Sequence, residues 1–214
     1  MIPRRTFLRT LAAVGGALAL PATLLPATVQ RAWAARQRTP TSTEGPFYPT
    51  PSMRFADVDN DLVKVKGVVE RAGGEVVRLR GRVIDAAGQP VAGARVEIWQ
   101  CDGNGRYLHA DEAGKAGHDP GFQGFGYVVT GDDGVYAFRT IKPVPYPGRT
   151  PHIHVKVLHG GRELTSQFYT AGDRRNARDF LFRSMTRAQQ NSVLMAFKSL
   201  QGETEPTAIV DIVV

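Results

Sequence analysis

The 214-residue chain contains a single cysteine, Cys101. One thiol excludes an intrachain disulfide, and it also excludes the multi-thiolate clusters that bind zinc or iron–sulfur groups. Any metal bound by this chain must therefore use histidine, tyrosine, aspartate or glutamate. The hydrophobic content of 42 % is ordinary for a globular protein, and the length suits one domain with a core of useful size.

Acidic residues are absent from the first 34 positions, which contain Arg4, Arg5, Arg9 and Arg31. Without these four, 27 − 4 = 23 basic residues face 20 acidic ones, so most of the net charge of +7 belongs to this segment. No basic run with interleaved aromatic residues follows. We therefore expect no nucleic-acid partner.

The same N-terminal segment has the features of an export signal. Arg4-Arg5 is followed by Phe7-Leu8, an apolar run extends from Leu11 to about Leu25, and Ala32-Trp33-Ala34 is a small-x-small cleavage pattern. The run is short for a membrane span and contains glycine and proline. Residues 1–34 are therefore predicted to be a cleaved twin-arginine signal peptide, with a retained N-terminal anchor as the alternative. We expect a periplasmic or extracellular protein without a stable membrane span after cleavage.

Helical periodicity is scarce in the rest of the chain. Thr186 to Gln189 has the form of a capping box, an apolar stripe follows to Leu200, and Gly202 is a natural stop. Short apolar segments separated by turn signals instead favour an antiparallel β-sandwich with long loops and one helix in the C-terminal region. Residues 35–75 are expected to form an extended lead and loop, and residues 76–214 the β-sandwich domain. The expected strands span residues 76–83, 91–99, 125–129, 135–141, 152–157, 163–169 and 208–214.

Chemically useful side chains gather between Val144 and Val157. Prolines and a glycine make the segment before His152 a stiff loop, and from His152 onward alternation predicts a strand. Successive strand residues point to opposite faces, so His152 and His154 should share one face. With Tyr146 and Arg149 on the loop, this arrangement is half of a metal site. Further donors could come from Tyr107 or from other histidines, which are His109, His118 and His159.

Four motifs, in this order, resemble one known family. They are T-E-G-P-F-Y-P at 43–49, V-E-I-W-Q-C-D-G-N-G-R-Y at 96–107, P-Y-P-G-R-T-P-H-I-H at 145–154 and L-T-S-Q-F-Y at 164–169. Together they extend over most of residues 40–170. The chain resembles the intradiol ring-cleavage dioxygenases, the group that contains protocatechuate 3,4-dioxygenase and catechol 1,2-dioxygenase.

The resemblance implies a non-haem Fe(III) held by Tyr107, Tyr146, His152 and His154, with a hydroxide as fifth ligand. Phenolate oxygen is a hard anionic donor that suits a hard trivalent cation, and two phenolates with one hydroxide cancel its charge. The implied reaction cleaves a catechol with O2 between its two hydroxyl-bearing carbons and gives a cis,cis-muconate-type diacid. Tyr146 would be the ligand that the catechol displaces, and the departing ligands would take the two catechol protons.

The resemblance also assigns two residues near the substrate. Arg149 corresponds to an arginine that offsets charge on the substrate ring, and Gln167 matches a glutamine beside the substrate. Only five residues separate Tyr146 from His152, fewer than in the better-known members. The helical dimerisation segment of the catechol 1,2-dioxygenases is missing. The identity of the catechol and the oligomeric state therefore stay open, and a homo-oligomer is compatible with the sequence.

Two alternative interpretations of the same residues compete with a dioxygenase function. Residues 81–99 also resemble transthyretin-like modules, which would make the chain a non-catalytic binding scaffold. A zinc hydrolase could use His152, His154 and a carboxylate, although no acidic residue nearby has suitable spacing.

Overall fold

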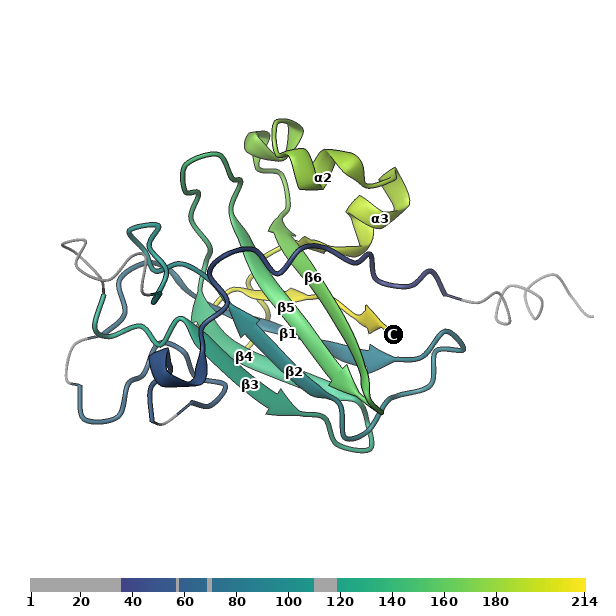
Figure 1. The fold of residues 1–214 in the computed structure, drawn as a ribbon, viewed down its shortest axis with the longest axis horizontal. Helices are drawn as coiled ribbons and strands as arrows, with labels where there is room; N and C mark the ends of the chain where they lie inside the picture. Colours follow the sequence, from purple (N-terminus) through teal and green to yellow (C-terminus); the bar gives the residue numbers. More distant parts are fainter. Residues whose placement is uncertain (1–35, 57, 69–70, 110–118) are drawn as a thin grey trace, which may run out of the picture. The chain divides into compact units, whose positions relative to one another are not determined.

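The computed structural model describes residues 36–56, 58–68, 71–109 and 119–214, and in this part of the chain the strands form two sheets (Figure 1). The smaller sheet has the order β4–β1–β8, with β9 also paired to β1. The larger has the order β3–β2–β5–β6–β7. The strands are β1 (Val76–Ile84), β2 (Arg95–Trp99), β3 (Phe125–Val129), β4 (Val135–Ile141), β5 (His152–His159), β6 (Arg162–Thr170), β7 (Leu194–Met195), β8 (Thr207–Ile209) and β9 (Ile212–Val213).

The mainly β fold predicted from the sequence is confirmed, with one difference in strand direction. The pairs β1–β4, β2–β3, β2–β5 and β5–β6 are antiparallel, as expected. The three short strands at the C-terminal end pair in parallel instead, β7 with β6, and β8 and β9 with β1. A parallel return needs a crossover longer than a hairpin turn, and the helical segment after β6 supplies it for β7.

In the described part of the chain, all helical segments but one lie between β6 and β7. They are the 3₁₀ turn η2 (Arg174–Ala177), α2 (Phe180–Ser184) and α3 (Arg187–Ser192), while a further 3₁₀ turn, η1 (Pro51–Met53), lies in the N-terminal loop. The capping box at Thr186 is confirmed, with reciprocal bonds between Thr186 and Gln189.

The predicted extension of this helix to Leu200 is wrong. Val193 already has non-helical dihedral angles, and Leu194–Met195 pairs with β6. Burial of Val193 and Met195, both at 0 % exposure, against the sheet outweighs the helical spacing of the apolar residues.

The core lies between the two sheets and is filled by alternate residues of the strands. On β5, Ile153, Val155 and Val157 belong to this core, so His152, His154 and Lys156 point to the opposite face of the larger sheet. All six residues are buried. The outer face of this sheet is therefore covered by other parts of the chain, and it carries polar side chains that need partners.

The N-terminal lead provides that cover. It is drawn in dark blue in Figure 1, where it crosses β6 and β5. Its hydrogen bonds to the strands include Ser42 N–H to Thr165 O at 2.8 Å and Ser166 Oγ to Pro40 O at 2.7 Å. Residues 1–34, the predicted export signal, lie outside the described residues, so that prediction stays a prediction. No described helix is both long and apolar enough to cross a membrane.

Candidate active site

Four aromatic side chains from three segments gather on the outer face of the larger sheet. The ring centroids are 4.8 Å apart for His152 and His154, 5.4 Å for Tyr146 and His152, and 5.5 Å for Tyr107 and Tyr146. Tyr107 and His154 close the group at 6.1 Å. All four donors predicted from the sequence therefore lie together.

The two histidines present their Nε2 atoms to the same point. His152 Nδ1 lies 2.7 Å from the carbonyl oxygen of Thr150 and must donate to it, which leaves Nε2 as the nitrogen with the lone pair. The Nε2 atoms of His152 and His154 are 3.2 Å apart. His154 is held by a stacked ring contact with Trp99, at 4.7 Å between centroids. A cation at this point could accept a lone pair from each of the two Nε2 atoms.

Tyr107 is positioned by the turn that precedes it. Gly105 has φ +76° and donates to Asp102 O at 3.0 Å, and one oxygen of the Asp102 carboxylate accepts from the N–H groups of Asn104 and Arg106. The Tyr107 side chain is 3 % exposed, and its hydroxyl makes no hydrogen bond of normal geometry, although Tyr146 is close enough to affect its pKa. A buried hydroxyl without a partner is costly, so a ligand for this oxygen is expected.

Tyr146 lies on a tight turn at the surface. Arg149 N–H donates to Tyr146 O at 2.9 Å, and Pro147 and Gly148 occupy the two central positions. Gly148 has φ +82°, which matches the third position of a type II turn. The Tyr146 ring is half-buried, and its hydroxyl has a long hydrogen bond of 3.4 Å from Arg149 Nη1. Tyr107 is therefore fixed by its surroundings, whereas Tyr146 is held loosely.

The loop at residues 43–49 closes over the donors. Gly45 has φ +72°, and a Cβ atom there would lie 3.5 Å from His154 Cε1, so the backbone passes close to this ring. Phe47 stacks on Tyr107 with centroids 4.7 Å apart and an interplanar angle of 15°. The Tyr48 hydroxyl donates to Glu97 at 2.7 Å and ties the loop to β2.

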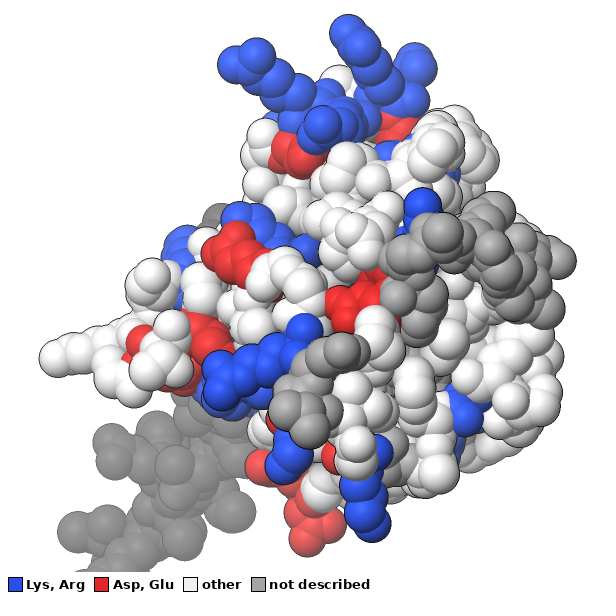
Figure 2. All heavy atoms as spheres, turned by 90° about the vertical axis from the view of Figure 1, so that its left-hand side faces the viewer, with Lys and Arg blue, Asp and Glu red and all other residues white. Residues whose placement is uncertain are grey.

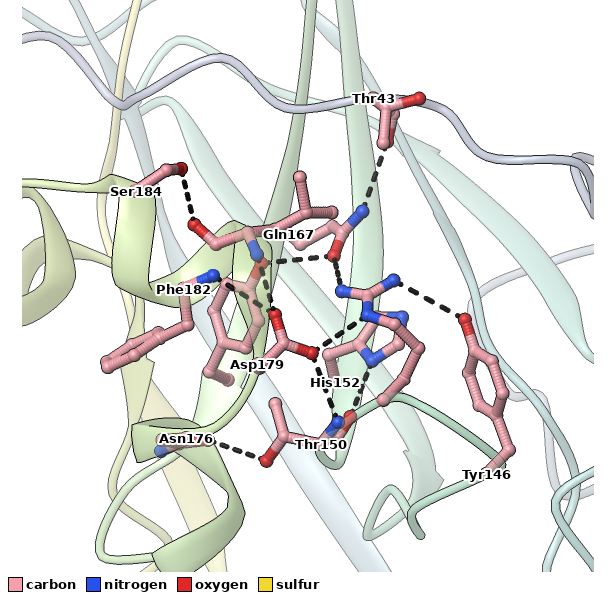
Figure 3. A network of polar contacts seen from close by, with 12 residues as sticks. Thr43, Tyr146, Thr150, His152, Gln167, Asn176, Asp179, Phe182 and Ser184 are labelled. Atoms are coloured by element: carbon pink, nitrogen blue, oxygen red, sulfur yellow. Dashed lines mark hydrogen bonds and ion pairs between the residues drawn. The ribbon is translucent and has the colours of Figure 1, made fainter.

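Arg149 bonds to Tyr146, Gln167 and Asp179, three residues of the polar network that Figure 3 labels. Its Nη2 donates to Gln167 Oε1 at 2.6 Å, its Nε to Asp179 Oδ2 at 2.8 Å, and its Nη1 points toward Tyr146. Gln167 in turn accepts from Tyr169 Oη at 3.1 Å and donates to Thr43 O at 3.1 Å. Both residues that the sequence placed near the substrate are thus adjacent to the candidate metal ligands.

The sequence analysis missed Asp179, which is 2 % exposed. Burial alone would raise the pKa of this carboxyl, but hydrogen bonds from Arg149 and from the N–H groups of Phe182 and Thr150 lower it overall. An aspartate before Phe180-Leu181-Phe182 is recognisable as a helix N-cap, but no local pattern indicates its second role at Arg149, 30 residues away.

Burial controls the protonation of the donors. It lowers the pKa of His152 to about 4, with a further contribution from Arg149, and it lowers the pKa of His154 well below its usual value. It also raises the pKa values of both tyrosines, while Arg149 acts in the opposite direction on them. The imidazoles are thus neutral donors near pH 7. The phenols need a strong adjacent cation to lose their protons, as a trivalent metal ion provides.

The donor set fits ferric iron. It comprises two neutral nitrogens facing one point, an unpartnered buried phenol and a second phenol beside it. Among the described residues no group of three or more His, Cys, Asp or Glu side chains could hold a metal, so the zinc–carboxylate alternative finds no ligand set there. His109 lies near Phe47, His159 is exposed at the end of β5, and His118 lies outside the described residues.

Fold and site together define a β-sandwich protein with a candidate tyrosine–histidine metal centre. A family model described as dioxygenase, Dioxygenase_C, matches residues 43–212. The chain belongs to the intradiol ring-cleavage dioxygenase family.

Two curated relatives show the range of similarity. The chain is 36 % identical over 149 residues to the protocatechuate 3,4-dioxygenase beta chain of Burkholderia cepacia, covering 65 % of this chain and 63 % of that protein. It is 34 % identical over 154 residues to catechol 1,2-dioxygenase 1 of Acinetobacter lwoffii, covering 63 % of this chain and 47 % of that protein. The chain thus matches less than two thirds of the length of these relatives.

Solved structures of similar size agree with the fold. The dioxygenase domain of a dioxygenase carbohydrate-binding protein fusion from Streptomyces sp. SirexAA-E is 31 % identical, with a TM-score of 0.60, and the match covers 83 % of this chain and 98 % of that one. An intradiol ring-cleavage dioxygenase from Tetranychus urticae has a TM-score of 0.66 at 22 % identity, covering 83 % and 94 %, and supports the fold alone.

Proposed function

We propose that this protein is an Fe(III)-dependent intradiol dioxygenase. It would cleave the ring of a catechol with O2 between the two hydroxyl-bearing carbons and yield a cis,cis-muconate-type diacid. The observation that supports this most directly is the meeting of Tyr107, Tyr146, His152 and His154 at one point, with the Tyr107 hydroxyl buried and unpartnered. A binding scaffold has no use for an unsatisfied phenol in its interior.

Ferric iron, when bound, would supply the Lewis-acid and redox chemistry that makes a catechol ring reactive toward O2. The chain's own residues have distinct tasks around it. Tyr107, His152 and His154, each at most 3 % exposed, hold their positions. Tyr146, half-buried on a surface turn, would be the donor that gives way to the substrate.

Tyr146 and Arg149 are placed to accept a catechol proton and to stabilise negative charge. With iron held by the other three donors, the Tyr146 Oη would take one of the two catechol protons as a general base. The Arg149 guanidinium lies within 3.4 Å of that oxygen and stabilises negative charge on the oxygen and on the nearby substrate ring. Gln167 and Asp179 hold the guanidinium plane, which keeps Nη1 directed at the site.

The surface beside the site favours a catechol that carries a negative charge. Five exposed arginines lie on η2, α2, α3 and the residue after η2, and Figure 2 shows basic side chains at the top of the view, where Figure 1 has α2. We call them the cap arginines. They are Arg174, Arg175, Arg178, Arg183 and Arg187. Of these five arginines, only Arg175 forms an ion pair with another described residue, Asp173 at 3.3 Å.

The three arginines of β1, by contrast, are neutralised by acidic partners. On β1, Arg78, Arg80 and Arg82 pair with Glu205, Glu203 and Asp211 respectively. The cap arginines therefore leave a positive field near Arg149, which attracts a carboxylated catechol more strongly than an uncharged one.

A substrate panel tests the proposed reaction. Iron-loaded protein is mixed with protocatechuate, catechol and hydroxyquinol while O2 uptake and diacid formation are followed. We expect activity, with kcat/KM for protocatechuate falling as salt is raised and kcat/KM for catechol unchanged. Arg174→Gln/Arg183→Gln should weaken that salt dependence, whereas Arg82→Gln should not. Folded, iron-containing protein that consumes no O2 with any catechol would refute the proposal.

The variant Tyr107→Phe separates the enzyme from a transthyretin-like scaffold. Ferric tyrosinate absorbs visible light, so loss of one phenolate should shift or weaken the visible band of the iron-loaded protein. A scaffold would bind no iron and would show neither the band nor its change.

We also propose that residues 1–34 direct export by the twin-arginine route, so that the folded domain functions in the periplasm or outside the cell. The test is fractionation of cells that express the whole chain, compared with cells that express an Arg4→Lys/Arg5→Lys variant. The variant should stay in the cytoplasm; equal distribution of both would refute the proposal.

A further inference from the structure

Asp179 connects two parts of the structure through one buried carboxylate. Its Oδ1 accepts from the N–H groups of Leu181 and Phe182 at 3.1 and 3.0 Å, which caps α2. Its Oδ2 accepts from Arg149 Nε at 2.8 Å and from Thr150 N–H at 3.2 Å. Figure 3 shows Asp179 between Phe182 and Thr150. One oxygen therefore serves the helix, and the other serves the loop of the candidate site.

The contact with Arg149 determines the orientation of the guanidinium. The Asp179 side chain is 0 % exposed and that of Arg149 is 11 % exposed, so each charge depends on the other for compensation. A guanidinium is planar, so fixing its Nε edge fixes the directions of both Nη atoms. With Nε on Asp179 and Nη2 on Gln167, Nη1 is left to face Tyr146.

The contact with Thr150 extends this control to a candidate metal ligand. Thr150 is held by its N–H on Asp179 and by its hydroxyl, which donates to Asn176 Oδ1 at 2.7 Å. The carbonyl oxygen of the same residue accepts from His152 Nδ1 at 2.7 Å and fixes that ring. The segment from η2 to α2 therefore supports both the charge beside the site and the first histidine of β5.

We propose that Asp179 is a positioning residue of this site, which acts through Arg149 and Thr150 and couples α2 to the candidate catalytic groups. The effect on turnover rests on the proposed dioxygenase function, whereas the effect on Arg149 does not. The placement of α2 therefore sets the orientation of Arg149. Phe180, the first residue of α2, is 65 % exposed, and its ring lies 5.6 Å from Arg149 Cζ.

The test uses Asp179→Asn, because asparagine caps a helix about as well as aspartate but presents no charge to Arg149. Asp173→Asn is the matched control. Asp173 caps η2 by accepting from Arg175 N–H, and it also pairs with an arginine, but that pair is exposed. If Asp179→Asn fails to fold, Asp179→Ser replaces it, since serine is an equally good N-cap without charge.

The first readout needs neither iron nor activity. In ¹H–¹⁵N spectra of the metal-free protein, the Nε–H signal of Arg149, assigned by its loss in Arg149→Lys, should be protected from solvent exchange. It should lose that protection in Asp179→Asn and keep it in Asp173→Asn. A signal that is equally protected in all three proteins would overturn the proposal.

The second readout is kinetic. In the iron-loaded enzyme, Asp179→Asn should lower kcat roughly 10- to 100-fold, with a smaller change in KM. In an Arg149→Lys background the same substitution should cause a smaller loss, because only the part transmitted through Thr150 remains. Independent, multiplicative losses would refute the action of Asp179 through Arg149. Loss of Nε–H protection in a protein without activity toward any catechol would refute the proposed function but support the positioning role.

Discussion

The contact between Phe47 and Tyr107 gives a quantitative test of how the N-terminal loop supports the candidate metal centre. The two rings stack at 4.7 Å with an interplanar angle of 15°, and Tyr107 is almost fully buried. Such aromatic pairs contribute ~0.5–1.5 kcal/mol beyond the apolar area that they bury. Phe47→Leu and Tyr107→Leu each keep an apolar side chain but remove the stacking.

The stacking energy is isolated by a double-mutant cycle in the metal-free protein. Phe47 also contacts His109 and Tyr146 at 5.7 and 6.4 Å between centroids, so its single substitution measures more than one contact. The cycle subtracts these contributions, and we expect a coupling of about 1 kcal/mol between Phe47 and Tyr107. Urea denaturation supplies the free energies of unfolding, provided that the m-values agree.

A matched pair controls this measurement. Ile209 is 65 % exposed on β8 of the other sheet, so Phe47→Leu and Ile209→Ala should be additive. A Phe47–Tyr107 coupling below about 0.3 kcal/mol, the usual error of additivity, would refute the view that the loop clamps this tyrosine.

Three further predictions follow from burial and close contact. The pKa of Cys101 is raised to about 12, chiefly by burial and then by Asp102, so the thiol should not react with a disulfide reagent at pH 8 until urea unfolds the protein. In thermal melts, Gly81→Ala should lower stability by roughly 3 kcal/mol or more, because the added Cβ would lie 1.8 Å from Val210 O. The control Gly131→Ala, whose Cβ would have its nearest contact at 3.6 Å, should change stability by under about 0.5 kcal/mol. The pKa of His152 falls from 6.5 to about 4 on folding, so the unfolded chain binds a proton that the folded site excludes. The metal-free protein should therefore lose up to about 3 kcal/mol of stability between pH 6.5 and pH 4, and His152→Gln should flatten this part of the stability profile measured by urea denaturation.

Local patterns explain why much of the site could be predicted from the sequence. Alternation from His152 onward places both histidines on one face, and the structure confirms it because the apolar partners Ile153 and Val155 are buried in the core. The glycine of the Asp102–Gly105 turn fixes how the chain reaches Tyr107. These features depend on neighbours within a few residues, so the sequence contains the information.

Features that depend on distant partners could not be predicted in the same way. The apolar residues after Ser192 have helical spacing, yet Leu194–Met195 adds to β6 because an open sheet edge is available there in the fold. Asp179 has a local signature as a helix cap, but its bond to Arg149 depends on how the β5 loop and α2 pack. The sequence pattern also gives no sign that the lead covers the outer face of the larger sheet.

The burial of the donors indicates the side from which a substrate can reach them. Tyr107, His152 and His154 are covered by Phe47 and Gly45 of the loop and by Trp99 beneath them. Tyr146 alone is half-buried, and it lies on the side of Arg149. Phe180, exposed on α2, borders that same guanidinium. Because Tyr146, the Arg149 guanidinium and the first residue of α2 share one side, we expect changes in α2 to alter substrate entry and the position of this charge together. Changes in the 43–49 loop should instead alter the positions of Tyr107 and His154.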